Sequence, residues 1–141
     1  MIYFKSSNII SSLGFGTSDN FSSLLVGNIG ISKIENSELY HEAFHASMID
    51  EKELEKKFVL VANRYSNNNY FTKLEKMIIL SIEDALLSAY VDISSSRTAI
   101  IISTTKGNID LLSNSYSGEV EKERVYLWKL GSVISSFFGN P

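Results

Sequence analysis

Residues 97–112 read Arg-Thr-Ala-Ile-Ile-Ile-Ser-Thr-Thr-Lys-Gly-Asn-Ile-Asp-Leu-Leu, and the other segments are best understood as packing around them. The part from Thr98 to Ser103 is a short, unbroken apolar run rich in isoleucine. Such a run is typical of a strand buried on both faces, because a strand with one wet face alternates apolar and polar residues. Thr104 to Gly107 has the chemistry of a turn with helix capping, and the apolar residues of 109–112 can begin a helix. We therefore expect a buried strand that turns into a helix, the central unit of an α/β sheet.

The composition is typical of a domain with a packed core. The chain has 141 residues, of which 44% are hydrophobic and 21% are charged, and this length suits a single domain over residues 1–141. The net charge is only −3 and the basic residues are scattered, so we expect no nucleic-acid partner. No apolar stretch approaches the length of a membrane span and no secretory signal is recognisable, so we expect a cytoplasmic location and no membrane partner.

The chain contains no cysteine. This composition excludes a disulfide, a Cys-ligated zinc site and a thiol nucleophile within these residues. We expect no cofactor and no metal.

Further elements follow from periodicity and capping signals along the chain. The strongest helix is expected over residues 70–90, where apolar residues recur at spacings of three and four. Asp50 and Glu53 form a capping-box pattern, which predicts a short helix through about Val59. The remaining expected elements are a first strand over 2–4 and 9–10, a helix from Thr17 or Ser18 that ends at Gly27, a possible edge strand within 41–48, and a final helix from near Glu123 to Gly139.

This order of elements predicts an α/β fold, with a small, mostly parallel sheet and helices on its faces, because right-handed crossovers join parallel strands. The sheet would have only about three or four strands, which hints at a missing continuation. Ligands of such sheets bind beyond the carboxyl ends of the strands, so residues 103–106 are expected near any site.

Five stretches, in order along the chain, carry a resemblance to one protein family. They are a turn at residues 11–14 (Ser-Ser-Leu-Gly), a helix-to-loop run at 21–31 (Phe-Ser-Ser-Leu-Leu-Val-Gly-Asn-Ile-Gly-Ile), a helix end at 84–89 (Asp-Ala-Leu-Leu-Ser-Ala), the Arg-led strand and turn at 97–107, and the final Phe-Phe-Gly-Asn-Pro at 137–141. This pattern resembles the amino-terminal part of the β-ketoacyl synthases, the condensing enzymes with the thiolase-like fold. The turn at 103–107 is poorer in glycine than the family's.

The resemblance implies an acyltransferase that condenses an acyl thioester with malonyl-carrier protein, with loss of CO₂, in fatty acid or polyketide synthesis. In that family the nucleophilic cysteine follows the Gly-x-Pro motif by a few residues, and the chain stops before it. We therefore expect a partial thiolase-like fold with no catalytic residue, inactive alone. The implied partners are an acyl carrier protein and a synthase chain in a homo- or hetero-oligomer. Leu111 and Leu112 are expected, by resemblance only, near the substrate pocket and the dimer interface.

Two other interpretations stay open at this point. The chain could be a non-catalytic partner or scaffold subunit, of the kind that determines chain length beside a complete synthase, or an unrelated small α/β binding domain. A half-domain should expose a wide apolar surface where its other half packs. We therefore expect the isolated chain to self-associate or to be poorly soluble.

Four further candidates have simpler explanations or lack support. His41 and His45 have a metal-ligand spacing on a helix, but no third ligand is evident and a solvated or edge-strand position is favoured. Lys106 and Gly107 lack the spaced glycines of a phosphate loop, so a capping turn is the better account. Trp128 could belong to a partner surface, although core packing is favoured. A Ser-His-Asp triad is disfavoured because no Gly-x-Ser-x-Gly elbow exists.

Overall fold

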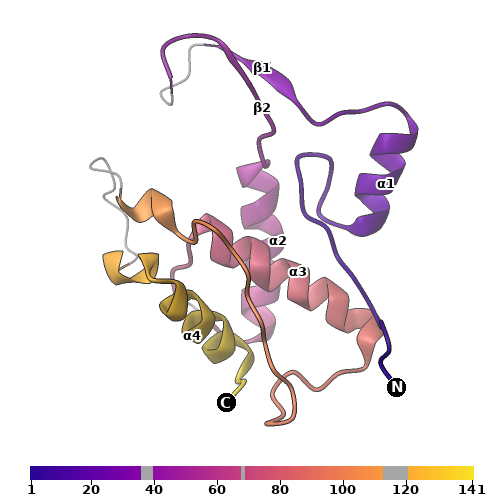
Figure 1. The fold of residues 1–141 in the computed structure, drawn as a ribbon, viewed down its shortest axis with the longest axis vertical. Coiled ribbons are helices and arrows are strands. Elements are labelled where there is room, and N and C mark those ends of the chain that lie inside the picture. Colours follow the sequence, from indigo (N-terminus) through magenta and orange to yellow (C-terminus); the bar gives the residue numbers. More distant parts are fainter. Residues whose placement is uncertain (36–39, 68, 113–120) are drawn as a thin grey trace.

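The computed structural model describes residues 1–35, 40–67, 69–112 and 121–141 (Figure 1). Helix α2 (Glu51–Arg64) begins at Asp50, whose carboxylate accepts hydrogen bonds from the backbone N–H groups of Lys52 and Glu53, both at 3.0 Å. Helix α3 (Lys73–Ala89) begins with a complete capping box between Thr72 and Glu75. Both helices start where side chains satisfy the free N–H groups of a first helical turn.

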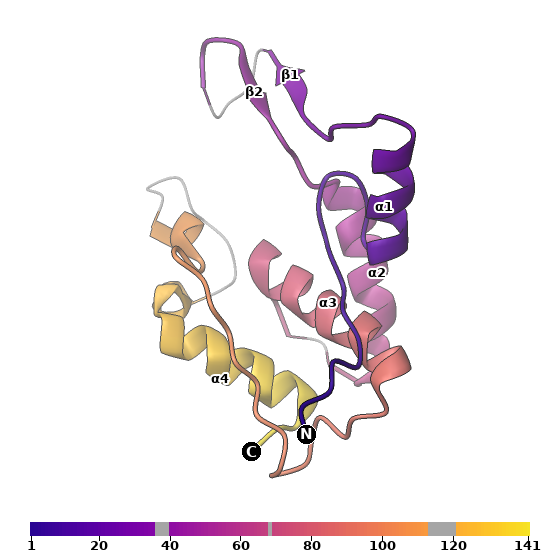
Figure 2. The ribbon, with the colours of Figure 1, turned by 45° about the vertical axis from the view of Figure 1, so that its right-hand side comes forward.

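The core lies where α2, α3 and α4 (Leu127–Phe138) pack together (Figures 1 and 2). Ile79 from α3 and Leu130 and Ile134 from α4 are fully buried. Phe58 from α2 lies 6.4 Å, between ring centroids, from Phe137 of α4. Burial of these large apolar side chains is the main source of stability in a domain of this size.

A smaller part of the chain extends away from this helical body. It consists of helix α1 (Thr17–Leu25) and the two-stranded antiparallel hairpin of β1 (Ser32–Ile34) and β2 (Phe44–Ala46), with Lys33 opposite His45 (Figure 1). The apolar face of α1 is largely exposed, because its only buried residue is Asn20. The Asn20 amide donates to the backbone carbonyls of Ile9, Gly14 and Gly16 at 2.8–3.1 Å, and so fixes the turn before the helix.

Two short 3₁₀ helices complete the described elements, η1 (Ile109–Leu112) and η2 (Lys122–Val125). The turn before η1 needs a glycine at position 107, whose φ is +56°. A Cβ atom there would also meet Leu127 Cδ2 at 2.7 Å. The capping turn predicted at this place is confirmed, since Thr104 Oγ1 accepts a hydrogen bond from the Gly107 N–H at 3.1 Å.

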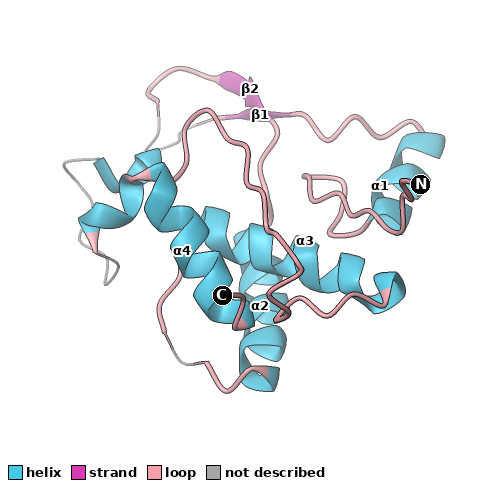
Figure 3. Ribbon diagram, turned by 60° about the horizontal axis from the view of Figure 1, so that its bottom comes forward, coloured by secondary structure: helices cyan, strands magenta, loops and turns pink. Residues whose placement is uncertain are grey.

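The predicted α/β fold with a mostly parallel sheet, and with it the partial thiolase-like fold, is wrong. The described residues form a mainly helical domain whose one sheet is the antiparallel hairpin (Figure 3). Residues 2–10 and 98–104 are extended, but no strand pairs with either of them within the part of the chain that the structure describes. A strand forms only where a neighbouring strand pairs with it through hydrogen bonds. The apolar pattern of one segment does not show whether such a neighbour exists.

Several sequence predictions are confirmed. The helices expected at Thr17, Glu51 and over residues 70–90 are present, and α2 continues to Arg64. The edge strand expected within 41–48 is β2, although it pairs in a hairpin. The final helix begins at Leu127, later than expected, because residues 122–125 adopt the 3₁₀ helix η2.

Candidate functional site

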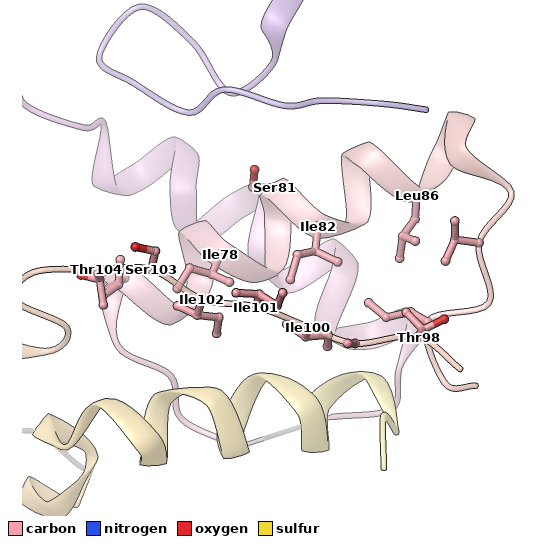
Figure 4. A pocket seen from close by; sticks show the side chains of 14 residues that line it. Ile78, Ser81, Ile82, Leu86, Thr98, Ile100, Ile101, Ile102, Ser103 and Thr104 are labelled. Atoms are coloured by element: carbon pink, nitrogen blue, oxygen red, sulfur yellow. The ribbon is translucent and has the colours of Figure 1, made fainter. Parts of the chain in front are cut away.

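An apolar hollow lies between α3 and the extended segment Thr98–Thr104. It is an open groove of about 540 Å³, and every residue that lines it is uncharged. Ile78 and Ile82 from α3 and Ile101 from the extended segment line the groove together (Figure 4). The other lining residues are Leu74, Ser81, Leu86, Val91, Ile93 and the remainder of residues 98–104. An uncharged groove of this kind suits an apolar occupant.

Burial alternates along the extended segment as it does along a strand. Thr98, Ile100, Ile102 and Thr104 are half-buried, whereas the residues between them are exposed. Ile100 and Ile102 pack against the core, but Ile101 is 90% exposed. The expectation of burial on both faces is therefore wrong, because helices cover only one face of the segment.

The backbone of the extended segment offers free hydrogen-bonding groups. From Ala99 to Ser103, neither an N–H nor a carbonyl forms a hydrogen bond with any described residue. Peptide groups are obligatory hydrogen-bonding groups, which either face water or take a partner. The segment thus has the exposed edge of a strand without its neighbour.

The two ends of the extended segment are held in place. The Asn140 amide, just after α4, donates to the carbonyls of Ile93 and Thr98 at 2.6 and 3.0 Å. At the other end Thr104 caps the turn that leads to Asn108. The segment is therefore fixed at both ends, and its middle is open on one face.

A charged side chain stands just beyond each end of this segment. Arg97 precedes it and Lys106 follows it, and both residues are exposed. Neither forms an ion pair with a residue for which the structure gives a position. The groove is therefore uncharged along its length and has one cation beyond each end.

Next to the turn lies a buried polar cluster, formed by Thr72, Glu75, Asn108 and Arg124. Glu75 and Asn108 are both 0% exposed. The Asn108 amide donates to Glu75 Oε1 and to the Arg124 carbonyl, each at 3.0 Å, and Thr72 Oγ1 donates to Asn108 Oδ1 at 2.6 Å. Arg124 Nε lies 3.3 Å from Glu75 Oε1. The cluster joins the start of α3, the turn before η1 and the segment before α4.

These bonds leave the cluster no group with which to act on a ligand. Among the described residues every buried side-chain nitrogen and oxygen has a hydrogen-bond partner. A buried acid that is fully paired in this way serves packing rather than chemistry. The capping-box spacing of Thr72 and Glu75 is a signal in the sequence that could have located half of the cluster.

The hydroxyl of Tyr65 has a clearly shifted pKa. Burial, and then the hydrogen bond that the Tyr65 hydroxyl donates to Glu83 Oε2 at 2.8 Å, raise the pKa of Tyr65 from 10.0 to about 12. Arg64 Nη1 lies 2.9 Å from the other oxygen of Glu83. The Tyr65 ring packs against Phe137 and Phe138 of α4.

Leu111 and Leu112 have different environments in the structure. Leu111 is 1% exposed and belongs to the interior, whereas Leu112 is 63% exposed. Both lie on η1, and neither lines the groove. Their expected place near a substrate pocket or dimer interface stays a prediction.

The other sequence candidates occupy ordinary positions. His41 is exposed and its Nε2 lies 3.9 Å from Glu42 Oε1, while His45 lies in β2. Among the described residues no group of three or more His, Cys, Asp or Glu side chains could hold a metal ion. Trp128 is 68% exposed, with Lys129 Nζ 5.6 Å from its ring centroid, so the expected core packing is wrong. No helix within the described ranges is long and apolar enough to cross a bilayer.

Comparisons of the chain with protein-family models, with curated proteins and with solved structures return no match. The similarity to β-ketoacyl synthases therefore rests on the sequence motifs alone.

Proposed function

We propose that this chain is the amino-terminal part, or a truncated relative, of a β-ketoacyl-[acyl carrier protein] synthase, and that it pairs with a polypeptide that supplies the nucleophilic thiol. The assembled pair condenses an acyl thioester with malonyl-carrier protein, in the cytoplasm. The chain itself has no cysteine. Its role is to complete the structure around a thiolate that another segment provides, because a good nucleophile is indispensable for covalent acyl transfer.

The observation that carries the proposal is the unfinished state of the extended segment. It follows Arg97, at the place where the sequence resembles the family's Arg-led strand. It lies between α3 and α4 (Figure 4), and Ile100 and Ile102 are on the face that packs against the core. The other face exposes Ile101, and the backbone from Ala99 to Ser103 is unpaired within the described residues. A surface with these properties favours a role in pairing with protein over a free-standing catalytic one.

A second observation agrees with pairing. The amino-terminal residues 1–4 and helix α1 also expose large apolar side chains, as a half-domain should. Ile2 is 100% exposed and Phe4 is 84% exposed, and on α1 Phe21 and Leu25 are 61% and 70% exposed. Patches of this kind mark surfaces that another protein covers.

The test is co-expression of the chain with the carboxyl-terminal part of a β-ketoacyl synthase, starting just before that enzyme's nucleophilic cysteine. We expect a complex that releases CO₂ from malonyl-carrier protein and forms the β-ketoacyl product, with only background activity from either part alone. Replacing the cysteine of the partner by alanine is the control, and it should abolish condensation but not assembly.

Two results would count against the proposal. If no complex forms, the pairing is wrong. If a stable complex forms without condensation, the catalytic role is wrong, and the chain acts as a non-catalytic subunit.

A further inference from the structure

We propose that the groove along residues 98–104 binds an extended segment of the partner polypeptide as an added β-strand, and that this segment is uncharged and bordered by an acidic residue at each end. The inference rests on the proposed function for the existence of a partner chain. It goes beyond that function by stating the chemistry of the contact.

The unpaired backbone groups of the extended segment favour a polypeptide as the molecule that binds in the groove. The N–H and carbonyl groups from Ala99 to Ser103 have no partner among the described residues. An occupant that covers them must return hydrogen bonds, since burying a peptide group without a partner is costly. An added strand does this along its whole length, whereas an acyl chain has no donor and only its terminal carbonyl to accept.

The side chains along the groove favour an uncharged segment as the bound molecule. Ile101 is 90% exposed, and it is among the residues that line the hollow, together with Ile78 and Ile82 of α3 (Figure 4). No charged residue lines this hollow. A charge on the middle of the added strand would lose its hydration there and gain no partner, so the middle of the strand carries apolar and hydroxyl side chains.

The two cations at the ends define the borders of the added strand. Arg97 and Lys106 are exposed and form no ion pair with the described residues. An acidic residue at each end of the partner segment would meet one of them. Complementary charges at the rim of an interface set orientation and discriminate against other partners.

The same cations disfavour a second copy of this chain as the occupant. Antiparallel pairing of two copies of the extended segment would bring Arg97 of each copy toward Lys106 of the other, and parallel pairing would place like residues together. The other exposed apolar segment, residues 1–4, is followed directly by Lys5. Like charges opposite one another destabilise strand pairing.

The test measures the binding of fluorescein-labelled heptapeptides to the full chain by fluorescence anisotropy. The probe is Asp-Val-Thr-Val-Thr-Val-Asp, and its charge control is Lys-Val-Thr-Val-Thr-Val-Lys. A third peptide keeps the acidic sequence but carries N-methyl groups on alternate residues, which removes backbone donors. We expect the acidic peptide to bind at least tenfold more tightly than either control.

Variants of the chain locate the contact. Ile101→Lys should weaken binding of the acidic peptide at least tenfold, and the double variant Arg97→Glu with Lys106→Glu should reverse the preference in favour of the Lys-bordered peptide. Val26→Lys is the matched control, because Val26 is 76% exposed and lies on the smaller part of the chain, after α1. Circular dichroism establishes that each variant is folded.

Four outcomes would overturn the inference. Absence of peptide binding by the folded chain does so, as does equal binding of the N-methylated peptide. Displacement of the acidic peptide by dodecanoate would assign the groove to an acyl chain, and self-association abolished by Ile101→Lys would assign it to a second copy. Peptide binding without condensation in the co-expressed pair would overturn the proposed function alone, and condensation without peptide binding would overturn this inference alone.

Discussion

A single turn joins the buried polar cluster to the extended segment, and the two regions differ in whether their polar groups are hydrogen-bonded within the protein. Around Glu75 and Asn108 every buried side-chain donor and acceptor is used, and both residues are 0% exposed. From Ala99 to Ser103 the peptide groups are free among the described residues, and Ile101 is 90% exposed. The difference separates a part of the chain whose buried polar groups are paired within the protein from a part whose peptide groups have no partner among the described residues.

We expect substitutions in the two regions to have very different effects on the free energy of unfolding. A residue of the cluster supports the fold of the isolated chain, so its replacement should lower the free energy of unfolding. A residue of the exposed face of the segment supports only what binds there, so its replacement should leave the isolated chain as stable as before.

The largest effect is expected for Glu75→Ala. The change leaves Arg124 and Asn108 without their carboxylate inside the protein, which should lower the free energy of unfolding by about 3–5 kcal/mol in urea denaturation. Glu55→Ala is the control, since Glu55 pairs with Lys76 at the surface and should cost less than about 1 kcal/mol. Equal losses for the two variants would mean that burial does not distinguish these acids.

The next largest effect on stability is expected from a comparison of two isoleucines, one buried and one exposed. Ile79→Ala should cost about 2–5 kcal/mol, because Ile79 is 0% exposed and the change leaves a cavity. Ile101→Ala should change stability by no more than about 0.5 kcal/mol. Denaturant midpoints of the two variants, measured at one protein concentration, test this contrast. A large loss for Ile101→Ala would show that the exposed face is covered in the isolated chain.

Gly107→Ala tests the turn that joins the two regions. The φ of +56° and the approach of Leu127 Cδ2 to the added Cβ should together cost about 1–2 kcal/mol. Thermal unfolding followed by circular dichroism measures the loss. Gly131→Ala is the matched control, because a Cβ at Gly131 meets nothing within 4 Å and position 131 lies inside helix α4. A control variant at least as stable as the original chain is expected from helix propensity.

The smallest effect concerns Tyr65, which packs against Phe137 and Phe138. Because its pKa is raised from 10.0 to about 12 in the folded state, its contribution to stability is fully present below pH 10 and is lost as the pH rises toward 12. Urea denaturation at pH 8 and at pH 11.5 should show a smaller decline for Tyr65→Phe than for the original chain. A parallel decline in both would contradict the shifted pKa.

The sequence predicted the helices better than the fold. Caps and apolar spacing are local signals, and they located the starts of α2 and the span of α3 because a helix satisfies its backbone within itself. A strand is not local in this sense. The run Ile100–Ile102 has every local property of a buried strand, yet it pairs with no described residue, because pairing depends on a neighbour that no local pattern can identify.

The expectation of a site near residues 103–106 depends on a parallel sheet that the structure does not have. Ser103 and Thr104 line the groove, and the binding of a ligand there stays a prediction. The contribution of α3 and the exposure of Ile101 were not foreseen, because periodicity reports that a side chain is apolar and not what covers it. Trp128 is expected in the interior and lies at the surface, because periodicity does not show which side of a helix is covered. Leu111 lies in the interior, and its place near a substrate pocket stays a prediction.

The amide of Asn140 has a consequence for the way in which the molecule opens. It reaches across 42 positions of sequence to hold the carbonyl of Thr98, and also that of Ile93. Fraying of the last turn of α4 therefore releases the start of the extended segment at the same moment. We expect the amides near Ser136 and near Thr98 to exchange in one cooperative event. Binding of a molecule at the groove should therefore slow amide exchange at the end of α4.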